Sequence, residues 1–211
     1  QHHFNVPVES FDEAVFTDGL MFDGSSIRGF QAIHESDMKL LPIPESAFID
    51  PFRDVKTLVI LFSVHNPVDD SPYSRDPRGV VAKAVKYLQG TGIADTAFFA
   101  PEAEFYVFDA IRFKTGMNES YHHIDSYEGA WNTGVEYDPD GTPNRGYRTR
   151  IKGGYFPVSP TDQFADLRDQ MVMKLGEAGL LVERSHHEVG TAGQMEINYR
   201  FSDILNAGDD V

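Results

Sequence analysis

Four glutamates stand in stretches whose other residues are typical of apolar β-strands. Glu102 and Glu104 lie two residues apart in Pro-Glu-Ala-Glu-Phe, so a strand would point both to one face, about 6.5 Å apart along the backbone. Glu188 and Glu196 flank a short connection, and a hairpin centred on Ala192 would place these two carboxylates directly opposite each other. Like charges that face each other across a ladder are destabilising.

A bound cation would relieve this repulsion, because carboxylates among aromatic and β-branched residues cost several kcal/mol per uncompensated ion. The chain has no cysteine, and an oxygen-rich donor set favours Mg²⁺ or Mn²⁺. A solvated strand face explains any single glutamate better, but two pairs beside His186 and His187 favour a divalent site. His187 would face away from Glu188, either packed or in solvent. His122 and His123 lie in a polar stretch and indicate a solvated pair.

A second signal is Asp23-Gly24-Ser25-Ser26, a turn of small polar residues before an expected strand. Its plainest interpretation is a hairpin turn. The chain has no glycine-rich phosphate-binding motif, so a nucleotide would be held mainly through metal. A basic group near Tyr155 could meet phosphate or carboxylate, although ion pairs with surface acids explain it equally well. This basic group comprises Arg145, Arg148, Arg150 and Lys152.

The composition excludes several classes of partner. The 211 residues include 33 acidic and 18 basic ones, for a net charge of −15, so nucleic acid and anionic membranes find no clustered basic surface. Apolar residues at 41% are sufficient for a folded core. We find no apolar run of membrane-spanning length and no signal peptide. With the absence of cysteine, these features favour a soluble protein of the reducing cytoplasm.

The elements that must position these residues fall into two groups. Strands are expected at 27–33, 47–49 and 57–64. The proline-spaced stretch 65–78 marks a domain boundary. Asp76 as N-cap and Pro77 at the first helical position then open a helix that Gly90 and Gly92 close. The second group has a central strand at 96–108, a long irregular segment at 112–160, and strands at 180–189 and 194–201. Between them, Thr161 or Asp162 caps a helix that ends near Gly176 or Gly179.

Taken together, these motifs resemble those of the bacterial type I glutamine synthetases. Residues 22–30 with Glu-Ser-Asp-Met at 35–38 resemble the family's N-terminal signature, and residues 101–105 its first metal strand. Residues 152–157, Lys-Gly-Gly-Tyr-Phe-Pro, and residues 186–196 resemble its central motifs. The order and spacing of all four motifs match the family along the whole chain.

The resemblance assigns metal ligands. Glu104, Glu188 and Glu196 match the three carboxylates of the metal nearer the glutamate substrate. Glu102 matches one ligand of the metal nearer the ATP phosphates. The resemblance therefore implies two or more Mg²⁺ or Mn²⁺ ions per site, with ATP as co-substrate.

The resemblance also assigns substrate contacts. Asp23 and Ser26 match a turn that reaches into the adjoining subunit's active site, where the aspartate helps bind ammonium and withdraw its proton. Tyr155 matches a further wall of that ammonium pocket. Glu183 and Phe201 match positions that line the nucleotide pocket.

For fold and function, the resemblance implies an α+β protein. Residues 1–73 would form a small β-grasp-like domain without its first strand, and residues 74–211 the first part of an antiparallel-sheet catalytic domain. The parent enzyme would join ammonia to the γ-carboxylate of L-glutamate through γ-glutamyl phosphate. Shared active sites imply a homo-oligomer, a dodecamer of two hexameric rings in the family.

Two alternatives share the same motifs. A ligase that joins glutamate to a polyamine or another amine would keep the metal cage and alter the ammonium pocket, but Asp23, Ser26 and Tyr155 are all present. A non-catalytic structural or regulatory relative would tend to lose metal carboxylates, and all four are present. The family's remaining metal ligands and substrate arginines would follow Val211, so we expect the isolated 211 residues to be inactive.

Overall fold

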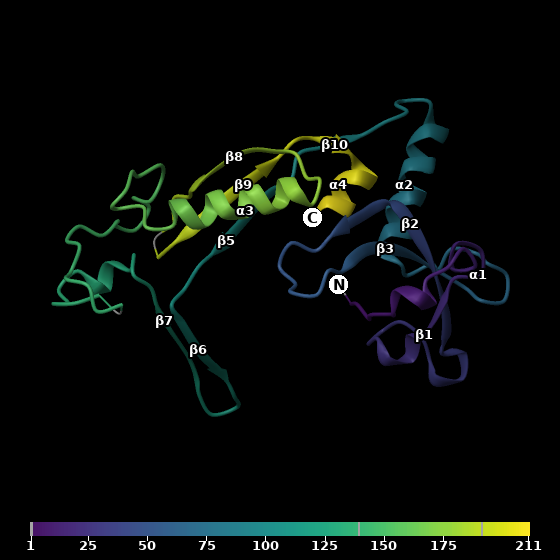
Figure 1. Ribbon diagram of the computed structural model, residues 1–211, viewed down its shortest axis with the longest axis horizontal. Coiled ribbons are helices and arrows are strands. Elements are labelled where there is room, and N and C mark those ends of the chain that lie inside the picture. Colours follow the sequence, from purple (N-terminus) through teal and green to yellow (C-terminus); the bar gives the residue numbers. More distant parts are fainter. Residues whose placement is uncertain (1, 139, 191) are drawn as a thin grey trace. The chain divides into compact units, whose positions relative to one another are not determined.

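The computed structural model describes residues 2–138, 140–190 and 192–211, which form two compact units. The first unit comprises Gln1–Phe99 with Ser202–Val211, and the second Ala100–Phe201 (Figure 1). Every strand pair in the described residues is antiparallel, and the expected α+β class is confirmed. No helix within those residues combines the length and the apolar character needed to cross a membrane.

The first unit is built on a sheet of order β1-β2-β3. Its strands are β1 (Leu20–Asp23), β2 (Asp37–Ile49) and β3 (Leu58–His65). The predictions of strands at 47–49 and 57–64 are confirmed, since the first falls within β2 and the second matches β3 to within one residue at each end. Met38 on β2 is buried at 1% exposure and belongs to the core of this unit.

The predicted strand at 27–33 is wrong. These residues form turns and lead into η3 (Ile33–Glu35). Gly29 has a left-handed φ of 85°, and Gly24 N donates to Ser36 O at 2.6 Å, which closes the loop between β1 and β2. Because β1 pairs directly with β2, no edge is left between them for another strand.

The long helix α2 (Pro77–Thr91) follows the predicted capping pattern. Asp76 accepts a hydrogen bond from Arg78 N, Pro77 occupies the first turn, and Gly92 ends the helix at a φ of 70°. The other oxygen of Asp76 accepts from Val64 N at 3.2 Å and so ties the helix start to β3. The predicted start and the end at Gly92 are confirmed, because caps depend on local sequence, whereas Gly90 lies within the helix.

Short elements complete the first unit. Strands β4 (Phe98–Phe99) and β10 (Ser202–Asp203) pair with each other. Helix α4 (Ile204–Asp210) is capped by Asp203, and Asp209 accepts a forked ion pair from Arg78 that joins α4 to α2. The remaining elements are η1 (Val8–Ser10), α1 (Val15–Asp18) and η2 (Gly24–Ser26).

The second unit carries a sheet of order β5-β9-β8. It is formed by β5 (Glu102–Tyr106), β9 (Gln194–Tyr199) and β8 (Val182–His187). Helix α3 (Ala165–Glu177) packs against β8 (Figure 1). Met195 and Ile197 of β9 are buried at 0% and 3% exposure.

The prediction of one central strand at 96–108 is wrong. The stretch is divided into β4 and β5, which belong to different sheets, and β5 lies at the edge of its sheet. Pro101 stands at the break. Proline has no N–H to donate to a ladder, so the pairing stops there.

The expected irregular segment at 112–160 is partly wrong, because it begins within a hairpin. Strands β6 (Ala110–Thr115) and β7 (Ser120–Asp125) form a two-stranded ribbon (Figure 1). A Lys114–Glu119 ion pair and a bond from Gly116 N to Glu119 O at 2.9 Å close its turn. His122 and His123 are exposed on β7, as expected. Beyond η4 (Ala130–Asn132), the described part of the segment contains no further helix or paired strand.

The predicted capping residue of α3, Thr161 or Asp162, is wrong by two or three positions. The helix begins after Phe164, which caps it without a side-chain hydrogen bond. Asp162 accepts from Phe164 N at 3.1 Å and forms a buried, forked ion pair with Arg168. Its carboxylate is therefore used to hold the first turn from outside the helix. The helix ends at Glu177, close to the predicted Gly176 and Gly179.

Candidate metal centre

The register of β8 against β9 decides which acidic side chains meet. His186 is paired with Glu196, and His187 with Met195. The prediction that Glu188 directly faces Glu196 is therefore wrong. Glu188 N donates to Gln194 O at 2.9 Å, so Glu188 lies beyond the last strand pair and diagonal to Glu196.

The reason for this register lies in the hairpin connection. Ala192 and Gly193 adopt left-handed φ values of 68° and 83°, and Gly190 N donates to the Gln194 side chain at 2.7 Å. The hairpin closes on Glu188 and Gln194 instead of centring on Ala192. A one-residue displacement of the turn exchanges the residue that faces Glu196.

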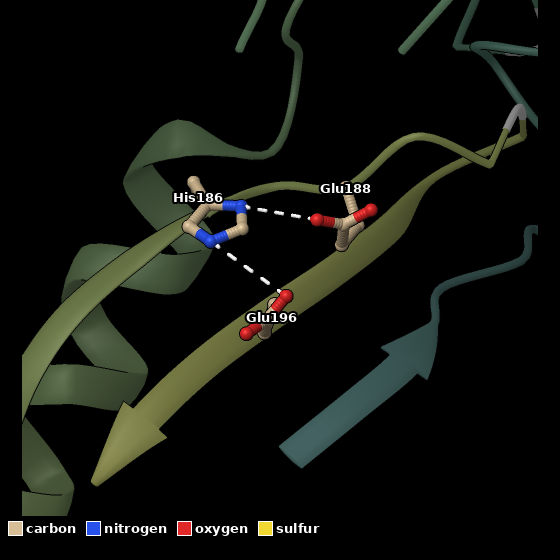
Figure 2. Close-up of side chains that lie close together, drawn as sticks. All are labelled: His186, Glu188 and Glu196. Carbon is tan, nitrogen blue, oxygen red and sulfur yellow. Dashed lines mark ion pairs between the residues drawn. The ribbon is translucent and has the colours of Figure 1, made fainter. Parts of the chain in front are cut away.

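His186, Glu188 and Glu196 form a compact cluster of potential metal ligands. One ligand atom from each lies within 4.8 Å of the others. Figure 2 shows the imidazole between the two carboxylates, with Nδ1 3.8 Å from Glu188 Oε1 and Nε2 3.7 Å from Glu196 Oε2. Sequence reasoning did not identify His186 as a ligand. The signal was its spacing of two from Glu188, which puts both on one strand face.

The other two predicted carboxylates lie on β5, beside this cluster. Glu104 is directly opposite Glu196, and its Oε2 accepts from Gln194 Nε2 at 2.8 Å. Glu102 is opposite Asn198, whose Nδ2 lies 3.4 Å from Glu102 Oε1. Strand alternation puts Glu102 and Glu104 on the same face, so all four glutamates border one region formed by β5, β9 and the connection after β8.

The donor set fits a hard divalent cation. The side chains of Glu188 and Glu196 are only 13% and 9% exposed, and within the described residues their ion pairs are with His186. Asn198 Nδ2 also donates to Glu196 at 2.5 Å. One histidine cannot balance this many clustered carboxylates. The residues present therefore suit Mg²⁺ or Mn²⁺, which prefer oxygen ligands.

Tyr155 lies next to the cluster. Its ring stacks on Phe156 with centroids 3.9 Å apart, and both rings meet the His186 imidazole edge-on at 5.6 and 4.7 Å. Backbone bonds hold this segment: Phe156 N donates to His187 O and Gly154 N to Val189 O, both at 3.3 Å. The structure thus brings Tyr155 together with the acidic cluster.

Asp23 and Ser26 belong to the first unit. Asp23 accepts from Ser25 N at 2.8 Å, Ser25 Oγ at 2.6 Å and Ser26 Oγ at 2.9 Å. The hydroxyl bonds from Ser25 and Ser26, followed by the backbone bond from Ser25, lower the pKa of Asp23 below its ordinary value of 3.8. The four residues form a capped 3-10 turn, η2, instead of the simple hairpin turn that the sequence indicated.

The remaining predicted site residues lie apart from the ligand cluster. Glu183 lines a pocket of about 360 Å³ between β8 and α3. Phe201 follows β9 and is 56% exposed. Arg200 N donates to Leu181 O at 2.8 Å, so Phe201 and Glu183 are found at the same end of the β8–β9 pair. The pocket residues are Asp169, Val172, Met173, Val182, Glu183, Arg184 and Ser185.

The basic group divides into paired and exposed members. Arg148 is 4% exposed and forms an ion pair with Asp138. Arg145 pairs with Asp140 at 2.6 Å. Arg150 and Lys152 are exposed. For the first two arginines the structure favours loop ion pairs, one of the two interpretations that the sequence left open.

His187 is packed in the core of the second unit. Of the two positions that the sequence left open for it, packed or in solvent, the structure shows the packed one. Its Nε2 lies 2.5 Å from Glu128 Oε2, and its Nδ1 lies 2.8 Å from Glu188 O. Burial lowers the pKa of His187, but the hydrogen bond and charge of Glu128, with backbone carbonyl oxygens, outweigh it and raise the pKa above its usual value. No sequence pattern singled out Glu128, because it lies in the irregular segment.

Comparisons with known proteins identify the family of the chain. A family model described as the catalytic domain of glutamine synthetase matches residues 74–211, and one described as its beta-Grasp domain matches residues 1–67. The chain belongs to the glutamine synthetase family. The β-grasp domain followed by a catalytic domain, expected from the resemblance, is thereby confirmed.

Named glutamine synthetases are close relatives over nearly the whole chain. The chain is 60% identical over 209 residues to the glutamine synthetase of Mycolicibacterium smegmatis and 57% to that of Frankia alni. Each match covers 99% of this chain and 44% of the relative. A solved Plasmodium falciparum glutamine synthetase shares the fold, with a TM-score of 0.79 at 23% identity over 96% of this chain and 39% of that one. The chain thus spans less than half the length of these relatives.

A side chain at position 193 is expected to destabilise this member of the glutamine synthetase family. Its φ is 83°, and an added Cβ would come within 2.8 Å of Phe164 Cε2 and Val107 O. We expect Gly193→Ala to lower the free energy of unfolding by about 1–3 kcal/mol, measured as a lower thermal midpoint. Gly90→Ala is the control, since Gly90 lies in α2 with open space around it and should gain about 0.5–1 kcal/mol. Equal midpoints for the two variants would contradict the prediction.

Proposed function

We propose that the complete protein carrying this chain is a glutamine synthetase that joins ammonia to the γ-carboxylate of L-glutamate at the expense of ATP, through γ-glutamyl phosphate. The observation that carries the proposal is the cluster of His186, Glu188 and Glu196 with Glu104 opposite, on strands of a chain 60% identical to a named glutamine synthetase. A carboxylate cage of this kind suits a reaction that transfers a phosphoryl group.

The cage residues have distinct roles in this proposal. Glu104, Glu188 and Glu196 hold one Mg²⁺ or Mn²⁺, with His186 beside them, and Glu102 contributes to a second. The bound cations would neutralise negative charge on the phosphoryl group during its transfer. The low exposure of Glu188 and Glu196 limits competing hydration and strengthens their hold on a cation.

The ammonium site is assigned to Asp23, Ser26 and Tyr155. The hydroxyl bonds from Ser25 and Ser26 lower the pKa of Asp23, which favours the charged carboxylate that attracts ammonium. This carboxylate is the proposed acceptor of the ammonium proton. Ser26 Oγ fixes the orientation of this carboxylate. The Tyr155 ring offers its π face to a cation.

The wider context of the proposal follows the family. Glu183 and Phe201 line the nucleotide pocket, and the chain divides near residue 73 into a β-grasp domain and a catalytic domain. Asp23 serves the active site of an adjoining subunit in a homo-oligomer, a dodecamer of two hexameric rings. The protein acts in the cytoplasm.

The test is a panel of amine substrates with the complete protein. We expect glutamine and phosphate to form in equal amounts from ATP, glutamate, ammonium and Mg²⁺. Methylamine, ethanolamine and putrescine should react with a much lower kcat/KM. A higher kcat/KM with one of these amines would replace the proposal with an amine ligase. Tight Mn²⁺ binding without turnover of any amine would indicate a non-catalytic relative.

A further inference from the structure

A buried acid–histidine pair lies directly behind the metal cage. Glu128 and His187 are both 1% exposed, and Glu128 Oε2 lies 2.5 Å from His187 Nε2. The two residues come from distant parts of the chain, since Glu128 follows β7 and His187 ends β8. The second carboxylate oxygen of Glu128 accepts from Gln163 N at 2.8 Å. Glu128 thus binds His187 of β8 with one oxygen and the backbone ahead of α3 with the other.

The Nδ1 side of the His187 ring and the His187 carbonyl contact the backbone of the residues around the proposed metal centre. Its Nδ1 donates to Glu188 O at 2.8 Å, and its own carbonyl accepts from Phe156 N at 3.3 Å. Gly154 fits against the same surface, because a Cβ there would lie 2.7 Å from Glu188 O and 3.0 Å from His187 Cε1. The imidazole is therefore enclosed between Glu128 and the peptide groups that present Glu188 and Tyr155.

The peptide group of Glu188 depends on hydrogen bonds from outside the regular strand pairing. It lies one residue beyond β8, where the strand pairing ends, and its N–H is held by Gln194 O at 2.9 Å. Its carbonyl oxygen accepts from His187 Nδ1 at 2.8 Å. If the imidazole rotates, Glu188 loses the bond that fixes where its side chain starts.

We propose that Glu128 is a positioning residue for this centre: it holds the His187 ring, and through it the backbone that presents Glu188 on one side and Tyr155 on the other. This inference rests on the proposed function, because it takes Glu188 as a cation ligand. A buried ion pair contributes little net stability compared with apolar residues of similar volume. Residues that orient metal ligands from behind, in contrast, have a large effect on metal affinity.

The test is Mn²⁺ titration of the metal-stripped complete protein, with free Mn²⁺ measured by electron paramagnetic resonance. We expect Glu128→Ala to bind Mn²⁺ about 10–100-fold more weakly. Glu128→Gln should retain most of the affinity, because its amide can accept from Gln163 N and donate to a neutral His187 ring. If Glu128→Ala does not fold, Glu128→Asp replaces it: its shorter side chain should also weaken Mn²⁺ binding, and unchanged binding would overturn the proposal.

Asp138→Ala is the matched control. It breaks another buried ion pair of the same segment, with Arg148, whose side chain is 1% exposed. We expect lower thermal stability and unchanged Mn²⁺ affinity. Equal weakening in Glu128→Ala and Asp138→Ala, or wild-type affinity in Glu128→Ala, would overturn the positioning role alone. Failure of the unaltered protein to bind Mn²⁺ would overturn the proposed function as well.

Discussion

Replacing Glu196 with glutamine is expected to abolish tight Mn²⁺ binding by the complete protein. Glu196 is central to the proposed cage, since Glu104 faces it across the ladder and His186 Nε2 lies 3.7 Å from its Oε2. Loss of an outer partner of a metal ligand already costs about 10–100-fold in affinity. We therefore expect more than about 100-fold from loss of a direct ligand, with a comparable fall in kcat/KM for glutamine formation.

The same variant should change stability with opposite signs in the two metal states. Without metal, glutamine removes one of two like charges that face each other, a gain of roughly 0.2–1 kcal/mol. With Mn²⁺ at 100 times the dissociation constant, the unaltered protein gains about 2.7 kcal/mol by mass action, and the variant gains almost none. The variant should therefore have a higher thermal midpoint than the unaltered protein in EDTA and a lower one in Mn²⁺.

Glu177→Gln is the control for this experiment. Glu177 is exposed at the end of α3 and pairs with Lys174, so its loss should leave both Mn²⁺ affinity and the metal-dependent midpoint unchanged. A Glu196→Gln variant that binds Mn²⁺ as tightly as the unaltered protein would contradict the assignment of the cage.

Replacing Asp23 with asparagine is expected to impair the ammonia step. The substitution keeps the size of the side chain, and the amide oxygen can still accept from Ser25 N, whereas the amide nitrogen cannot accept from Ser26 Oγ. It also removes the charge and the proton acceptor. General base groups contribute about 100- to 10,000-fold to rates. We expect kcat/KM for ammonium to fall by about 100-fold or more, while Mn²⁺ affinity stays unchanged.

The chain supplies a close structural control in Asp69. This aspartate accepts from Ser71 N at 3.0 Å and from Ser71 Oγ at 2.7 Å, and the Ser71 hydroxyl likewise lowers its pKa. Asp69→Asn repeats the same chemical change in the same kind of turn. Its kcat/KM for ammonium should match that of the unaltered protein. Equal losses in both variants would show that the effect of Asp23 is structural.

Local patterns in the sequence predicted those parts of the fold that depend on neighbouring residues. The cap at Asp76, the proline after it and the glycine at position 92 define α2 without reference to other elements. The stretch 27–33 has apolar residues suited to a strand, but β1 and β2 already pair with each other. Strand pairing is decided by distant residues, which a local pattern does not contain.

In the candidate site, too, the sequence predicted what depends on neighbouring residues and missed what depends on distant ones. Alternation along strands predicted that glutamates would gather on one face, and the structure places them on β5, β9 and the connection after β8. The exact register depended on left-handed backbone at Ala192, a residue without a strong preference for it. His186 was missed for that reason, since only the true register places it opposite Glu196. Glu128 was missed because an irregular segment has no periodicity from which its burial could be inferred.

The central place of β9 has a consequence for the order in which the centre is assembled. His186, Glu188 and Glu196 lie on one hairpin and can meet as soon as it closes, within about 1–10 μs for an isolated hairpin. Glu104 arrives only when β5 joins, and the Gln194–Glu104 bond spans 90 residues of chain. Pairing over such a separation is slow, because loop-closure entropy must be overcome first. In a solution that contains Mn²⁺, a folding chain would therefore present the proposed ligands of the hairpin before Glu104 is in place. Binding of the ion at that stage would favour the pairing of β5 with β9.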